Sequence, residues 1–135
     1  MDRRLSSLAC LLFALLLISS ARSAEVDQPA ASKPTVRLTI DYGDGFEKRF
    51  VALDWKEKMT VEDLLKLAQR HPRGIRYESQ GSGATCFLTK IDDLKNEGTG
   101  RNWIFRVNDK LGDRSFAIYP LEAGDVVLWK FSEYK

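Results

Sequence analysis

The fold is decided by Asn102-Trp103-Ile104-Phe105-Arg106-Val107-Asn108 and by a second stretch behind it, Tyr119-Pro120-Leu121-Glu122-Ala123-Gly124-Asp125-Val126-Val127-Leu128-Trp129. In the first stretch Trp103, Phe105 and Val107 fall on one side, which is the period of a β-strand. The second stretch contains a Leu-x-x-Gly-Asp corner and then a run of apolar residues. Together they predict two strands joined through a turn, and therefore a sheet.

A hairpin is predicted upstream of this pair. Val36, Leu38, Ile40 and Tyr42 alternate with polar residues, a pattern that gives a strand one buried face. Gly43-Asp44-Gly45 supplies residues that tolerate the positive φ of a tight turn. We expect the partner strand to run from about Glu47 to Leu53.

One amphipathic helix is predicted after the hairpin. Thr60 is a good N-cap with Asp63 three residues later, and four apolar residues follow at helical spacing: Val61, Leu64, Leu65 and Ala68. The helix should stop at His71-Pro72, because proline cannot continue it, and Gly74 suits the exit turn.

Shorter strands are predicted at Ile75 to Ser79 and Cys86 to Ile91, around a flexible Gly81-Ser82-Gly83 turn. A hairpin, one crossing helix and then further strands form the order of an α+β fold. The specific expectation is a β-grasp (ubiquitin-like) mixed sheet packed on the one helix.

The first 34 residues predict a secreted or periplasmic location. Arg3 and Arg4 precede an unbroken apolar run of eleven residues, Leu8 to Ile18, which small residues follow. This pattern is typical of a signal peptide, and the run is too short for a membrane-spanning helix, which needs about 20 residues. We predict a signal peptide over 1–23, a Pro- and Ala-containing disordered linker over 24–34, and one domain over 35–135.

Charge and cysteine content argue against a nucleic-acid partner and an internal disulfide. A cut after Ser23 leaves 112 residues with 18 Lys and Arg against 18 Asp and Glu, so the mature chain is close to neutral. No basic run interleaved with aromatics remains, which argues against nucleic acid as a partner. Cys86 is then the one cysteine, so no internal disulfide is expected, although a bridge between two chains stays open.

The motifs in order resemble the C-terminal domain of transcobalamin-like proteins. They are Tyr42-Gly43-Asp44-Gly45, Thr60-Val61-Glu62-Asp63-Leu64-Leu65, Ile75-Arg76-Tyr77-Glu78-Ser79-Gln80, Phe87-Leu88-Thr89-Lys90-Ile91, the Trp103 strand, and Leu121-x-x-Gly124-Asp125. The resemblance implies a domain that closes over cobalamin from one side, while a helical barrel supplies the rest of the envelope. This sequence contains no such barrel, so the resemblance implies a face that contacts a ligand.

The predicted sheet has apolar residues on both sides, whereas one helix covers only one. Either the loops from 74 to 102 fold over the second face, which we favour, or part of it stays open for a ligand or partner. The candidate ligand-binding residues are Tyr77, Gln80, Ser82, Phe87, Trp103, Phe105 and Tyr119. Tyr and Trp combine apolar area with a hydrogen-bonding tip, although each aromatic taken singly is more often core.

Catalytic and metal sites are weakly supported. His71 at a helix end favours a cationic cap over a base, and Cys86 beside Phe87 favours an inert thiol. Asp92, Asp93 and Glu97 lack the spacing of a calcium loop. No cofactor or metal is therefore expected, with a corrinoid open as a ligand.

The sequence predicts a non-enzymatic binding module. A small amphipathic ligand, corrinoid or glycan, would contact a sheet face and the loop at 79–85. The alternative is a protein–protein interaction domain that uses an exposed aromatic face or an edge strand.

Overall fold

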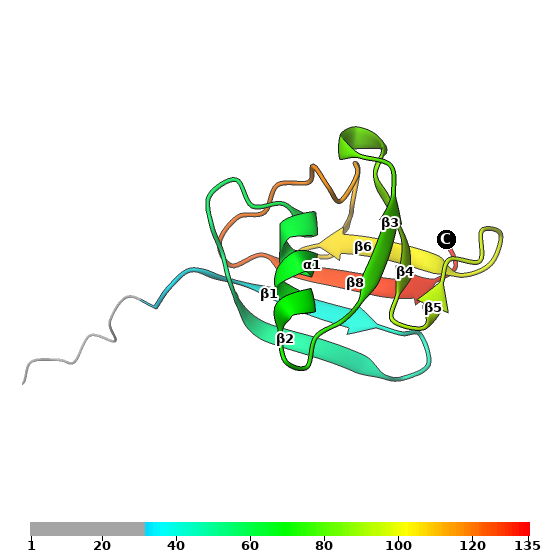
Figure 1. The fold of residues 1–135 in the computed structure, drawn as a ribbon, viewed down its shortest axis with the longest axis horizontal. Helices are drawn as coiled ribbons and strands as arrows, with labels where there is room; N and C mark the ends of the chain where they lie inside the picture. The colour runs from blue at the N-terminus through cyan, green and yellow to red at the C-terminus, as the bar shows by residue number, and fades with distance from the viewer. Residues whose placement is uncertain (1–31) are drawn as a thin grey trace, which may run out of the picture. The chain divides into compact units, whose positions relative to one another are not determined.

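The computed structural model describes residues 32–135, as two β-sheets and one α-helix. The predicted signal peptide and most of the predicted linker lie outside these residues. The larger sheet has the order β2-β1-β8-β6-β7, and the smaller has the order β3-β4-β5 (Figure 1). The strands of the larger sheet are β1 (Thr35–Asp41), β2 (Glu47–Asp54), β6 (Asn102–Val107), β7 (Lys110–Leu111) and β8 (Val126–Ser132). The remaining elements are α1 (Val61–Arg70), β3 (Tyr77–Gln80), the short 3-10 helix η1 (Gly83–Thr85), β4 (Phe87–Ile91) and β5 (Leu94–Lys95).

The expectation of an α+β fold is confirmed at this level, with mixed strand directions and a single α-helix in the described part. Strands β1 and β8 pair in parallel at the centre of the larger sheet, and its other pairs are antiparallel. None of the helices found in residues 32–135 has the length and apolar character that crossing a bilayer requires.

Helix α1 begins where its capping residues predict. The Thr60 side chain accepts a hydrogen bond from the Asp63 amide, and the Asp63 carboxylate accepts one from the Thr60 amide, so the capping box is complete. Two further amide donors of the first turn bond to the loop before β8: Val61 N to Tyr119 O and Glu62 N to Phe116 O, both at 3.0 Å. These bonds satisfy donors that a helix start leaves free, and they fix the loop against the helix.

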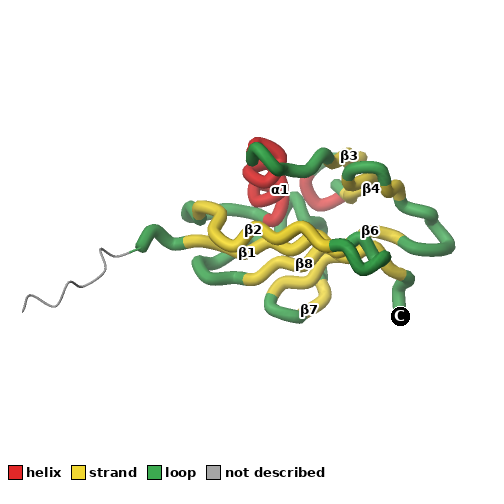
Figure 2. Tube along the Cα trace, turned by 90° about the horizontal axis from the view of Figure 1, so that it is seen from below, coloured by secondary structure: helices red, strands yellow, loops and turns green. Residues whose placement is uncertain are grey.

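Helix α1 and the smaller sheet cover the same face of the larger sheet (Figure 2). The prediction that the loops from 74 to 102 cover the opposite face is therefore wrong. The physical reason is the size of the helix: ten residues span about 15 Å, too little to cover all five strands. Strands β3, β4 and β5 instead cover the inner aromatic side chains of β6 and β8.

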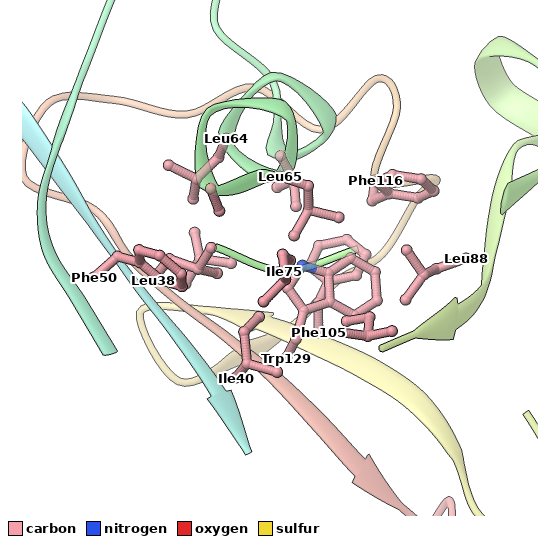
Figure 3. Packing of buried hydrophobic residues seen from close by; sticks show 14 of the residues in the cluster. Leu38, Ile40, Phe50, Leu64, Leu65, Ile75, Leu88, Phe105, Phe116 and Trp129 are labelled. Atoms are coloured by element: carbon pink, nitrogen blue, oxygen red, sulfur yellow. The ribbon is translucent and has the colours of Figure 1, made fainter. Parts of the chain in front are cut away.

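The core lies between these layers (Figure 3). Leu38 and Ile40 of β1 meet Leu64 and Leu65 of α1, and Trp129 of β8 lies among them with 2 % of its surface exposed. Every inner residue of β6 and β8 is buried, while the outer residues are partly or fully exposed. The period-2 pattern has thus correctly separated the two faces.

Candidate binding groove

An apolar groove lies between β4, β6 and the loop that follows β7. Strand β7 pairs with β6 only at Arg106 and Val107, so the first half of the outer edge of β6 is not covered by a neighbouring strand of the larger sheet. The groove has a volume of about 340 Å³. Its lining residues are Cys86, Phe87, Leu88, Asn96, Trp103, Ile104, Phe105, Leu111, Gly112, Arg114, Ser115, Phe116, Trp129 and Tyr134.

Buried aromatic rings form the floor of the groove. Trp103 is 6 % exposed and Phe105 is 9 % exposed. The Phe105 ring lies 5.0 Å from the Trp129 ring and 5.5 Å from the Tyr119 ring, measured between centroids. The Trp103 indole donates to Leu94 O at 2.8 Å, which fixes its orientation. The floor is therefore held rigidly from behind.

Exposed apolar side chains form the rim. Phe87 is 52 % exposed, Leu111 is 42 % exposed and Tyr134 is 72 % exposed. Apolar area of this kind that gathers at a concavity marks a binding surface more often than single exposed residues do. The rim and the floor together have the composition of a small-molecule or partner site.

Hydrogen bonds connect the walls of the groove. The Asn96 side chain donates to Leu88 O at 2.7 Å and accepts from Trp103 N at 2.8 Å, so it joins β4 to β6. Ser115 Oγ donates to Cys86 O at 2.5 Å and ties the later loop to the start of β4. Each bond uses a main-chain group that would otherwise lose its partner at an open edge.

The predicted site residues divide between three places. Phe87, Trp103 and Phe105 line the groove, and Tyr119 packs edge-on against Phe105. Tyr77 lies at a second cleft, whereas Gln80 and Ser82 are exposed around the β3–η1 turn and line neither cavity. Leu111, Phe116 and Tyr134 are groove residues that the sequence did not indicate, because each stands alone in a segment without apolar period.

The second cleft is polar and has a volume of about 820 Å³. Its centre is the Asp92 carboxylate, which accepts hydrogen bonds from the Tyr42 hydroxyl, from Lys48 Nζ at 3.4 Å and from Arg76 N at 2.9 Å. Burial and this carboxylate raise the pKa of Tyr42 above its ordinary range. The carboxylate therefore joins the hairpin to the smaller sheet.

Two other candidates have structural roles in the described part. His71 follows α1, where Nδ1 accepts from Arg73 N at 3.1 Å and the ring meets Phe50 edge-on. Cys86 is 5 % exposed, and its thiol lies 3.9 Å from the Glu62 carboxylate. Within residues 32–135 no group of three or more His, Cys, Asp or Glu is placed to hold a metal ion.

The protein is an α+β domain with an apolar groove beside the free edge of β6. The family described as "Domain of unknown function (DUF4430)" matches residues 59–133, which is more than half of the chain, so the chain belongs to this family. The matched segment includes α1, both walls of the groove and most of its rim.

One solved structure extends the comparison to most of the domain. It is the crystal structure of a "putative metal binding protein" from Ruminococcus gnavus ATCC 29149. The TM-score is 0.61 at 16 % identity, over 76 % of this chain and 100 % of that one. At this identity the likeness shows a shared fold alone. No curated protein matches the chain.

Proposed function

We propose that this chain is a secreted or periplasmic, non-enzymatic binding module of the β-grasp kind. Its groove would hold part of a small amphipathic ligand, a corrinoid or a glycan. The observation that carries the proposal is the exposed Phe87, Leu111 and Tyr134 around a buried floor of Trp103 and Phe105. Solvating this much apolar surface costs free energy, and a ligand that covers it recovers part of that cost.

The size of the groove limits what the domain holds by itself. A volume of about 340 Å³ is at the lower end of small-molecule sites, so it accepts one or two rings of a ligand. A corrinoid is larger than this. The domain would therefore contact one side of such a ligand, which agrees with the role of the transcobalamin-like domain that the sequence resembles.

The chemistry of the lining supports a non-enzymatic role. The Ser115 hydroxyl donates to a main-chain carbonyl, and the Cys86 thiol is buried. The thiol has the Glu62 carboxylate at 3.9 Å, and neither the hydroxyl nor the thiol has a histidine or lysine partner in the described part. Binding is what the groove supports.

We do not extend to this chain the metal binding that is named for the Ruminococcus gnavus protein. A site for a divalent ion needs several converging ligands. The acidic side chains of the polar cleft are spread over Glu78, Asp92 and Asp93, and Asp92 already accepts three hydrogen bonds. An anion–cation network accounts for this cleft without an ion.

A protein partner is the second candidate function. Strand β2 is an edge of the larger sheet, and Val51 on it is 72 % exposed. However, the β1–β2 register shifts between Val36 and Leu38, and a bulge of this kind is a common way to protect an edge from pairing. The exposed rim of the groove is therefore the stronger surface for a partner as well.

A titration with a matched pair of variants tests the proposal. The mature protein is titrated with cobinamide and cobalamin by tryptophan fluorescence, corrected for corrinoid absorption and repeated by calorimetry. Phe87→Ala removes the half-exposed ring of the groove, and Phe46→Ala removes a ring of similar exposure, 57 %, at the polar cleft.

We expect saturable binding that Phe87→Ala weakens by about tenfold or more and Phe46→Ala leaves within about twofold. The opposite order would move the site to the polar cleft and refute the groove. If neither corrinoid binds, the same pair of variants is used with glycans, and then in a pull-down for a protein partner.

A further inference from the structure

A cationic hollow lies on the outer face of the larger sheet, the face that α1 does not cover. Its volume is about 600 Å³, and it is lined by Gly43, Arg101, Ile104, Arg106, Leu128, Lys130, Phe131, Ser132, Glu133, Tyr134 and Lys135. Figure 2 shows the C-terminal end of the chain on this side of the sheet. Four cationic side chains and one carboxylate face the hollow, with Ile104 and Leu128 as an aliphatic floor.

The cations of the hollow are only partly neutralised by their neighbours. Arg106 forms no ion pair within residues 32–135, and Lys130 Nζ lies 3.9 Å from the Asp41 carboxylate, at the limit of an ion pair. Arg101 pairs with Glu97 at 3.4 Å, and its guanidinium covers the Phe131 ring at 4.9 Å. Pairs as exposed as these contribute little, so the hollow keeps a positive potential.

The hollow and the apolar groove are neighbours. Ile104 and Tyr134 line both of them, although Ile104 points to the opposite side of β6 from Trp103 and Phe105. The groove therefore opens around the free edge of β6 onto the outer face. Lys130 is the register partner of Ile104, and Arg106 lies two residues further along β6, so the two cations flank the residue that both cavities share.

We propose that the groove and the hollow form one two-part site for an amphipathic anion, with the apolar part in the groove and a carboxylate, sulfate or phosphate at Arg106 and Lys130. This inference rests on the proposed function and narrows the ligand class. Charge complementarity carries it: Arg106 has no ion-pair partner within residues 32–135, and Lys130 has only the Asp41 carboxylate, at 3.9 Å. An anion is attracted here in preference to a neutral molecule.

Calorimetry with two amphiphiles of equal chain length tests the proposal. Octyl sulfate and octyl glucoside are titrated below the concentrations at which they form micelles, with inorganic sulfate as a third probe. Arg106→Gln removes a charge of the hollow. Arg37→Gln is the matched control, because Arg37 is an exposed cation on the same outer face but does not line the hollow.

Octyl sulfate should bind more tightly than octyl glucoside, and added salt should reduce this preference. Arg106→Gln should weaken the binding of octyl sulfate about fivefold and leave the binding of octyl glucoside unchanged, while Arg37→Gln should change neither affinity. Equal affinities for the two amphiphiles, equal effects of the two variants, or inorganic sulfate binding as tightly as octyl sulfate would overturn the proposal.

The same experiment separates this inference from the proposed function. If octyl glucoside binds as tightly as octyl sulfate and Phe87→Ala abolishes the binding of both, the groove is a site for amphiphiles and only the anionic part is wrong. If neither amphiphile binds a folded protein, the groove itself has failed.

Discussion

Replacement of Gly112 by alanine tests whether the floor of the groove is rigid. A methyl group at this position would lie 2.2 Å from Cζ and 2.4 Å from Cε2 of the Phe105 ring. The ring has little room to move, because Trp129 and Tyr119 hold it from behind at 5.0 and 5.5 Å. Moving the backbone instead would stretch the hydrogen bond from Gly112 N to Phe105 O, which measures 3.0 Å.

The expected loss follows from these two alternatives. Overpacking of a filled site costs about 1–3 kcal/mol, and a lost hydrogen bond costs about 1 kcal/mol. Alanine also reduces the entropy of the unfolded chain, which returns about 0.4–1 kcal/mol. We expect the free energy of unfolding of Gly112→Ala to fall by about 1–2 kcal/mol, which moves the urea midpoint by about 1 M at an unchanged m-value.

Gly100→Ala is the control for this experiment. Its methyl group would meet only the exposed Glu97 side chain, at 3.1 to 3.4 Å, and a shift of a few tenths of an ångström relieves this contact without moving a packed ring. Gly100→Ala should therefore stay within about 0.5 kcal/mol of the parent protein. If Gly112→Ala proves as stable as Gly100→Ala, the Phe105 ring relocates freely, and the description of a preformed floor is refuted. A second check is the double variant with Phe105→Leu: compared with Phe105→Leu alone, the additional Gly112→Ala change should cost little, because the ring that it meets is gone.

Three further predictions concern stability. Thr60→Ala removes the N-cap of α1 and should lower the free energy of unfolding by about 1 kcal/mol in urea melts; an unchanged midpoint would contradict the role of the capping box. The pKa of Tyr42 is raised in the folded state by burial and by Asp92, so its contribution is fully present below about pH 10 and is lost as the pH rises further. Tyr42→Phe should therefore lose less stability than the parent between pH 9 and 11 in parallel urea melts. If the free energy of unfolding falls equally with pH in both proteins, the raised pKa of Tyr42 is refuted. Trp129 Nε1 is buried without a hydrogen-bond partner in the described part, whereas the Trp103 indole has one. Trp129→Phe should therefore lower the free energy of unfolding by about 1 kcal/mol less than Trp103→Phe in thermal or urea unfolding. The reverse order would mean that the Trp129 donor is satisfied.

Local signals in the sequence predicted the helix and the hairpin because their causes are local. The Thr60 and Asp63 pair sets the start of α1 through hydrogen bonds three residues apart, and His71-Pro72 ends it. The same holds for Gly43-Asp44-Gly45, where two glycines adopt positive φ between β1 and β2. These features needed no knowledge of the rest of the chain.

The position of the smaller sheet could not be predicted in the same way. A period of two tells which residues of β6 and β8 share a face, but it does not tell which face the segment from 74 to 102 will cross. That choice depends on the area left uncovered by a ten-residue helix, a property of the packed molecule. The outer face has isolated Ile104, Val126 and Leu128 among charged residues, so covering it would bury less apolar area than covering the inner aromatic rings.

The candidate site was predictable only where it belongs to a strand. Trp103 and Phe105 follow from the period of β6, whereas Leu111 comes from the two-residue strand β7, Phe116 from a loop and Tyr134 from the segment after β8. Aromatic character alone selected Tyr77, and the structure places it at the polar cleft. Residue type thus indicated a binding surface, but the tertiary fold decides which aromatics meet.

The way the groove is held together bears on how it would bind. Its main-chain walls are joined by Asn96 and Ser115 through bonds within the protein, so the groove exists without a ligand. A preformed site avoids the entropy of ordering its walls, and this raises the affinity that a modest apolar area provides. Tyr134 differs, because it lies near the chain end and is 72 % exposed. Since it borders both the groove and the cationic hollow, it is the side chain whose ordering would report that a ligand spans the two.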